Sequence, residues 1–306
     1  MKVMVFDVGG TEIKYSVMDE QLHRTNSGAV PTPQDTQAQF LDTLYRLYAP
    51  HKDEVTGIAM ALPGFVDNRT GYVSNGGALL YNTATPVGQL LAEKCGCPVI
   101  LENDGKAAAM AELANGALKG CCNAAVFIIG TGVGGGIIAN GQLVRGVHFT
   151  AGEYSFVNTN AEAWDAPDQN MACQCSTKNL LKWYRARKAL PEDAPLDGRS
   201  FFAAANAGEP EALEVLRRFC HAVAVQIFNL TVLLDVEKVA IGGGISKQPL
   251  LLESLRSAYD GLYASRAGQA YMEGLPRCQI VPCAFSSEAN QVGVAAAYFE
   301  AMQKKR

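Results

Sequence analysis

The chain has 306 residues, of which 48% are hydrophobic and 18% are charged, a composition typical of globular proteins. Its 26 basic and 30 acidic side chains give a net charge of −4, and no basic patch suited to nucleic acid is visible. No apolar run reaches the roughly 18 residues of a membrane span. Asp7 and the two glycines after it interrupt the first apolar stretch, so no signal peptide is expected. We therefore expect a cytoplasmic protein that binds neither nucleic acid nor membranes.

In chain order, hydrophobic periodicity and turn signals predict alternating strands and helices, as in α/β folds. The predicted strands are residues 3–8, 12–18, 55–62, 98–101, 125–129, 137–139 and 238–241. The predicted helices are residues 37–49, 86–94, 105–119, 209–235, 248–259 and 290–303. The segments 194–199 and 267–277 are expected to be surface connections.

Two glycine-rich turns share one local pattern. Residues 3–8 lead into Gly9, Gly10 and Thr11 before a second strand, and residues 125–129 lead in the same way into the glycine-rich segment 130–136. A hairpin signal, Asn140-Gly141, follows the second of these patterns. The recurrence predicts a duplicated α/β unit with a cleft between the two halves.

The glycine turns are suited to binding phosphate groups, because they gather backbone N–H groups at one point without a Cβ clash. An ordinary glycine hairpin explains either turn alone, whereas two such turns favour phosphate binding. Asp7 ends the first strand, where its carboxylate could hold Mg²⁺ through water or cap the turn. A third cluster, Gly242 to Gly244, lies between a predicted strand and a predicted helix, which favours an adenosine site beside a helix N-terminus.

Residues 101–105, Leu-Glu-Asn-Asp-Gly, end a predicted buried strand and open a helix. One Asx residue would serve as the helix N-cap, but two adjacent ones exceed that need. Asn103 could bind sugar hydroxyls, and Asp104 could orient a hydroxyl and accept its proton, as phosphoryl transfer requires. Glu153 is either a second hydroxyl acceptor or a solvated loop acid.

Several motifs together resemble the ROK (repressor, open reading frame, kinase) family. They are D-V-G-G-T-E-I-K, L-P-G-F-V-D, L-E-N-D-G-K-A-A-A, I-G-T-G-V-G-G-G-I, A-I-G-G-G-I-S and S-S-E-A-N-Q-V-G-V-A-A-A, which run in order from Lys2 to about Phe299. The resemblance implies an actin-like ATPase (ribonuclease H-like) fold with two α/β lobes and a cleft for sugar and ATP. The small lobe would comprise 1–118 and 290–306, and the large lobe 119–289. The resemblance also implies ATP and Mg²⁺ as cofactors, a small-molecule sugar substrate and a homodimer.

The same resemblance assigns roles by position. Asp104 would be the catalytic base, and Gly64, Asn103 and Glu153 would contact the sugar with it. The residues assigned to ATP and its metal are Asp7, Gly9, Gly10, Thr11, Lys14, Thr131, Gly132, Gly134, Gly243 and Gly244. Among them, Asp7 would hold Mg²⁺ through water.

The sequence departs from the family's usual zinc site. Phe156 stands where a His is usual, and Lys182 stands roughly at the place of a second Glu. Of the nine cysteines, only Cys173 and Cys175 match the zinc motif, and a structural zinc needs about four ligands. We therefore expect no zinc and small buried thiols. These departures resemble the zinc-free branch of the family, which includes β-glucoside kinases.

We conclude from the sequence that the protein is an ATP-dependent kinase of the 6-hydroxyl of a hexose or of the non-reducing glucose of a β-glucoside. A glucokinase or an N-acetylmannosamine kinase with a repacked site is the alternative. A sugar-responsive transcription regulator is disfavoured, because the first strand begins at Lys2 and leaves no room for a helix-turn-helix. A non-catalytic sugar-binding module would need neither Asp104 nor the phosphate turns.

Overall fold

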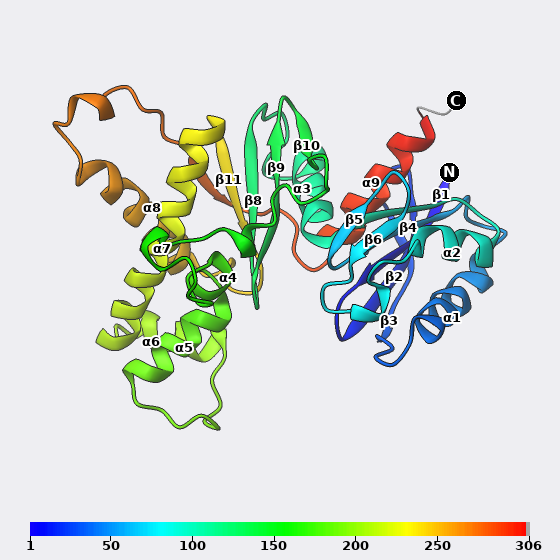
Figure 1. Ribbon diagram of the computed structural model, residues 1–306, viewed down its shortest axis with the longest axis horizontal. Helices are drawn as coiled ribbons and strands as arrows, with labels where there is room; N and C mark the ends of the chain where they lie inside the picture. Colours follow the sequence, from blue (N-terminus) through cyan, green and yellow to red (C-terminus); the bar gives the residue numbers. More distant parts are fainter. Residues whose placement is uncertain (304–306) are drawn as a thin grey trace. The chain divides into compact units, whose positions relative to one another are not determined.

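The computed structural model describes residues 1–303, which form two compact α/β units (Figure 1). The first unit contains Met1–Gly116, Leu143–Ala151 and the residues from Ser287 onward. The second contains Ala117–Gln142 and Gly152–Ser286. The sequence interpretation placed residues 143–151 in the large lobe, whereas in the structure they pack with the first unit.

The first unit is built on a five-stranded sheet with the strand order β3-β2-β1-β4-β7. Its strands are β1 (Lys2–Val8), β2 (Glu12–Asp19), β3 (Arg24–Pro31), β4 (Ile58–Leu62) and β7 (Val99–Asn103). Strands β1 to β3 are antiparallel, and β4 and β7 run parallel to β1. Because parallel strands end at one edge of a sheet, the residues after β1, β4 and β7 lie along that edge. A separate two-stranded sheet pairs β5 (Phe65–Asp67) with β6 (Tyr72–Asn75).

Helices cover this sheet and complete the first core. They are α1 (Gln37–Tyr48), α2 (Val87–Cys95), α3 (Asp104–Asn115) and α9 (Ala289–Gln303). Met4 and Phe6, alternate residues of β1, pack in one core with Phe40 and Leu44 of α1. Helix α9 packs against α3, β1 and β4. The last described helix of the chain therefore lies against its first strand.

The second unit repeats the sheet of the first. The strands of this second sheet are β8 (Ala124–Ile129), β9 (Val133–Ala139), β10 (Gln142–Val144), β11 (Lys238–Gly242) and β12 (Gln279–Pro282), in the order β10-β9-β8-β11-β12. The last two residues of β10 belong to the segment Leu143–Ala151, which groups with the first unit. Each sheet thus has a hairpin, a third strand beside it and two parallel strands on the other side, which confirms the predicted duplication. Asn140 and Gly141, with φ of 52° and 70°, form the predicted β9–β10 turn.

A helical layer packs on the second sheet. Its helices are α4 (Met171–Gln174), α5 (Thr177–Arg187), α6 (Gly198–Asn206), α7 (Pro210–Leu234) and α8 (Pro249–Ala264). Phe201, Phe219 and Leu251, from α6, α7 and α8, share a core with Phe127 and Ile241 of the sheet. Within residues 1–303, no helix is both long and apolar enough to cross a membrane.

Some predicted boundaries are wrong. The helix predicted to reach residue 119 ends at Asn115, and the strand predicted from residue 55 begins at Ile58. The segment 194–199, expected to be a connection, contains the start of α6, whose N-cap Asp197 accepts a hydrogen bond from the Ser200 amide. Strand β3 was not predicted, because it is a mostly exposed edge strand without apolar alternation.

Candidate active site

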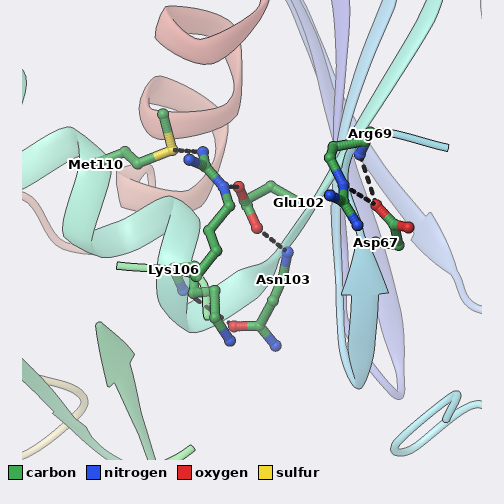
Figure 2. Close-up of polar contacts among 7 residues, drawn as sticks. Asp67, Arg69, Glu102, Asn103, Lys106 and Met110 are labelled. Carbon is green, nitrogen blue, oxygen red and sulfur yellow. Dashed lines mark hydrogen bonds and ion pairs between the residues drawn. The ribbon is translucent and has the colours of Figure 1, made fainter. Parts of the chain in front are cut away.

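The end of β7 places Asn103 and Asp104 as the sequence predicts. Asn103 is the N-cap of α3, and its Oδ1 accepts a hydrogen bond from the Lys106 amide at 3.0 Å (Figure 2). The Asn103 Nδ2 donates to the carbonyl of Gly64 at 3.0 Å. Asp104 is the first residue of α3, and its Oδ1 accepts from the Gly105 amide at 2.8 Å. Asn103 is thus the N-cap of the helix, and Asp104 accepts from a second amide of its first turn.

Gly64 follows β4 on the same edge of the sheet. Its φ of +99° is one that other residues rarely adopt, and an added Cβ would overlap the carbonyl of Asn75. Leu62, the last residue of β4, is paired in register with Asn103, the last residue of β7. The structure therefore brings together Gly64, Asn103 and Asp104, which the sequence places far apart.

The β1–β2 turn is held by its carbonyl oxygens. The Gly9 carbonyl accepts from the Thr32 hydroxyl at 2.8 Å, and the Gly10 carbonyl accepts from the Gln34 side-chain amide at 2.8 Å. The Thr11 carbonyl accepts from the Thr32 amide at 2.9 Å. With these carbonyls bound to the scaffold, the turn is fixed in one conformation, as a phosphate-binding loop requires. The roles of Thr32 and Gln34 had no signal in the sequence.

Asp7 lies in β1 beside this turn and is nearly buried. Its Oδ1 accepts a hydrogen bond from the Asn290 side-chain amide at 2.9 Å, and Lys14 is its register partner on β2. Burial raises the pKa of the Asp7 carboxyl, an effect that the Asn290 hydrogen bond and the Lys14 charge oppose. A carboxylate that is costly to ionise in this way gains from a nearby cation.

We expect Asp7→Asn to stabilise the metal-free protein at neutral pH. Because the folded-state pKa of Asp7 is raised, the wild type loses stability as the pH rises from about 3.9, the ordinary value, through the folded pKa. Asparagine does not ionise and keeps an acceptor for Asn290. The Tm of the variant minus that of the wild type, measured in chelator, should therefore grow between pH 4 and pH 7.

The matched control for this experiment is Asp19→Asn. The partly exposed Asp19 carboxyl has a lowered pKa, mainly because it accepts a hydrogen bond from the His23 amide. The wild type therefore gains stability from Asp19 above its ordinary pKa, and the variant should be the less stable one at pH 7. Equal Tm differences at both pH values for Asp7→Asn would contradict the burial of that charge.

The β8–β9 turn of the second unit is also braced. The Gly130 amide donates to the Gly132 carbonyl at 3.0 Å, and the Gly130 carbonyl accepts from the Thr177 amide at 2.9 Å. The Ser155 hydroxyl accepts from the Val133 amide at 3.0 Å and would crowd a Cβ at Gly132. Among the residues of this turn that the sequence assigns to ATP, Thr131 and Gly134 are exposed and Gly132 is half-buried.

Gly243 and Gly244 follow β11, next to the end of β8. Gly243 has a φ of +97°, and an added Cβ would overlap the carbonyl of Ile129. The sequence interpretation placed this cluster between a strand and a helix that begins at residue 248, and the order is as expected, with α8 beginning at Pro249. The turn 244–247 separates the cluster from the first residue of the helix. Gly243 serves a close backbone approach to β8, whereas an added Cβ at Gly244 would meet no atom within 4 Å.

Glu153 precedes the short helix η3 (Tyr154–Phe156) in the second unit. Tyr154 is buried, packs its ring on Phe127 and donates its hydroxyl to the Gly136 carbonyl at 3.1 Å. Phe156 is 69% exposed. The buried tyrosine anchors the segment that presents Glu153 and the Phe156 ring.

The cysteines form no disulfide in the structure, and all nine are free. Cys175 is buried, which raises the pKa of its thiol to about 12, whereas Cys173 is half-buried and Cys122 is exposed. Within residues 1–303, no group of three or more His, Cys, Asp or Glu side chains is arranged to hold a metal ion. The expectation of buried thiols is therefore correct for four cysteines, wrong for the exposed Cys122, and only partly met by the other four, which are half-buried. The four buried ones are Cys121, Cys175, Cys220 and Cys278.

Comparison with known proteins gives one family for the whole chain. The sequence profile of the ROK family matches residues 3–303. A β-glucoside kinase from Listeria innocua is 30% identical, over 84% of this chain and 87% of that protein. A glucokinase from Halalkalibacterium halodurans is 30% identical, over 79% of each. An N-acetyl-D-glucosamine kinase from Vibrio atlanticus is 31% identical, over 82% of this chain and 86% of that protein.

Two solved structures are similar over nearly their full length. A ROK family protein from Streptococcus pneumoniae TIGR4, in complex with sucrose, has a TM-score of 0.87 and 27% identity and covers 99% of this chain and 100% of its own. A ROK family glucokinase from Streptomyces griseus, in complex with glucose and AMPPNP, has a TM-score of 0.79 and 25% identity and covers 97% and 99%. Both similarities include both compact units.

Proposed function

Because the chain belongs to the ROK family, has the actin-like ATPase fold and is a carbohydrate kinase, we propose that it transfers the γ-phosphoryl group of ATP to the 6-hydroxyl of the non-reducing glucose of a β-glucoside. The observation that carries the substrate class is the exposed ring of Phe156, three residues after Glu153. Aromatic faces bind the apolar face of a sugar ring, so this residue suits a second sugar attached at C1.

The acceptor hydroxyl binds at the end of β7 in this proposal. Asn103 has one Nδ2 hydrogen and one Oδ1 lone pair beyond its bonds to Gly64 and Lys106, so it can bind a sugar hydroxyl in either sense. Asp104 accepts the proton of the attacking hydroxyl. From the second unit, Glu153 accepts a further sugar hydroxyl.

ATP binds through the glycine turns. The amides of Gly10 and Thr11 with the Lys14 side chain, and those of Thr131, Gly132 and Gly134, hold the phosphates. Gly9, whose amide donates to the Glu12 carbonyl at 2.9 Å, closes the turn that presents them. The turn that contains Gly243 and Gly244 binds the adenosine. The structure of the Streptomyces griseus glucokinase in complex with AMPPNP supports a nucleoside triphosphate as the phosphoryl donor.

Asp7 fits a role as the protein's Mg²⁺ ligand. Mg²⁺ is commonly held by one or two carboxylates together with water and substrate phosphates. The Asp7 carboxylate is buried beside the phosphate turn, and the Asn290 amide fixes its orientation. A bound Mg²⁺ would neutralise charge that develops on the transferring phosphoryl group.

A comparison of kcat/KM for cellobiose, glucose, N-acetylmannosamine and N-acetylglucosamine tests the proposal. We expect cellobiose to be preferred, with the product phosphorylated at the 6-position of its non-reducing glucose by NMR. Phe156→Ala should lower kcat/KM for cellobiose by about 2–13-fold, since an aromatic contact contributes about 0.5–1.5 kcal/mol, and should leave kcat/KM for glucose nearly unchanged.

A clear preference for one monosaccharide in this panel contradicts the β-glucoside proposal. Glucose or N-acetylmannosamine as the preferred substrate would identify the alternatives, a glucokinase or an N-acetylmannosamine kinase. Phosphorylation at a hydroxyl other than the 6-hydroxyl would contradict the assigned acceptor.

A further inference from the structure

Glu102 is a buried acid directly before the proposed acceptor site. Its side chain is 1% exposed, and both carboxylate oxygens have partners within the first unit. Oε2 accepts from Arg145 Nε at 2.7 Å, and Oε1 accepts from the Asn103 amide at 3.1 Å (Figure 2). The Arg145 guanidinium also donates to Met110 Sδ at 3.5 Å. One carboxylate thus joins a guanidinium to the backbone of Asn103.

These bonds continue to the residues proposed to bind the hydroxyl. The backbone amide of Asn103 donates to the Glu102 carboxylate. The Asn103 side chain accepts from the Lys106 amide and donates to the Gly64 carbonyl. Asp104 is the next residue. An ordered series of charged and neutral hydrogen bonds therefore runs from Arg145 through Glu102 to the end of β7.

A second contact fixes the segment that carries Arg145. In the first unit, the centroid of the Phe149 ring lies 4.7 Å from the Arg69 guanidinium. Arg69 in turn pairs with Asp67 (Figure 2). Phe149 has a φ of 60°, a conformation that bulky residues rarely adopt and that persists only where surrounding contacts impose it. The segment is thus held at two points, Arg145 and Phe149.

Only the acid of this pair is fully buried, since the Arg145 side chain is 28% exposed. Stability alone does not explain a buried carboxylate here, because apolar residues of similar volume are often as stabilising as an ion pair that includes a buried charge. We propose that Arg145 is a positioning residue for phosphoryl transfer: through Glu102 it fixes the strand end that presents Asn103 and Asp104 to the acceptor hydroxyl. This role rests on the proposed function of that strand end. A small displacement of reacting groups can cost about 10²-fold in rate, so the effect should appear in kcat.

The test compares Arg145→Met with the double variant Glu102→Gln/Arg145→Met. Arg145→Met leaves a buried carboxylate without its cation, so Tm and kcat should both fall, kcat by roughly 10–100-fold. The double variant removes the unpaired charge and should recover Tm, whereas kcat should stay low and the KM for ATP should stay within about twofold of the wild type. Arg145→Lys, which keeps the charge, should recover Tm and part of kcat.

Arg187→Met is the matched control, because Arg187 Nε pairs with Glu214 at 2.8 Å on the surface and both side chains are about half exposed. Its kcat should equal that of the wild type. A double variant that recovers Tm and kcat together assigns the pair a purely structural role and overturns the proposal. A wild type that phosphorylates none of the sugars contradicts the proposed function itself, and the positioning role with it.

Discussion

Asp104→Asn should lower kcat by about 10²–10⁴-fold, the usual contribution of a general base. Asparagine cannot accept the proton of the attacking hydroxyl, although it keeps nearly the same shape. The fold should survive, because the amide oxygen of asparagine can still accept from the Gly105 amide, as Asp104 Oδ1 does at 2.8 Å. Asn103 remains the N-cap of α3 in this variant.

The measurement is steady-state kinetics with saturating ATP and sugar, together with a melting curve. We expect the Tm to change by only a few degrees and the KM for ATP to change little. Asp197→Asn is the control, since Asp197 caps α6 through the Ser200 amide and asparagine caps a helix equally well. If Asp104→Asn keeps kcat within tenfold of the wild type, Asp104 is not the base.

The sequence predicted those parts of the site whose signals are local. The strand–turn–strand pattern around Gly9 and the strand-to-helix junction at Asn103 each depend on fewer than about a dozen residues, whose periodicity changes at the turn. Both elements lie where they were expected. The repeated pattern also predicted the duplicated sheet, since each unit uses the same order of strands.

Contacts between distant segments had no such signal. Asn290 contacts Asp7 from the other end of the chain, and Arg145 reaches Glu102 from a segment that the sequence interpretation assigned to the other lobe. These pairs arise from the packing of α9 and of residues 143–151 in the first unit, which no local pattern encodes.

The separation between the glycine cluster and α8 had a local signal in the sequence. Pro249 is the first residue of α8, a position that proline favours because its missing amide hydrogen is not needed there. The sequence interpretation began this helix at residue 248, one residue before its observed start, and inferred an adenosine site beside its N-terminus from the glycine cluster. The proline signal separates the glycine turn from the helix, so close packing against Ile129 is the better explanation of Gly243.

The second large effect concerns Gly293, a glycine inside α9. Gly293→Ala should destabilise the protein by about 3 kcal/mol, at the upper end of the usual range for overpacking. An added Cβ would overlap the backbone carbonyl of Ala107 in α3, so neither a rotamer change nor a flexible side chain relieves the clash. Because α9 also packs on β1 and β4, the two helices cannot separate without disturbing the first core.

Gly261→Ala is the matched control, because Gly261 is also a helical glycine but is exposed, with nothing within 4 Å of an added Cβ. There alanine should stabilise the protein by about 0.5–1 kcal/mol, since glycine loses more backbone freedom on folding. Melting curves should therefore show a Tm lowered by roughly 6–12 °C for Gly293→Ala and slightly raised for Gly261→Ala. If both variants raise the Tm, α3 and α9 are not in backbone contact at Gly293.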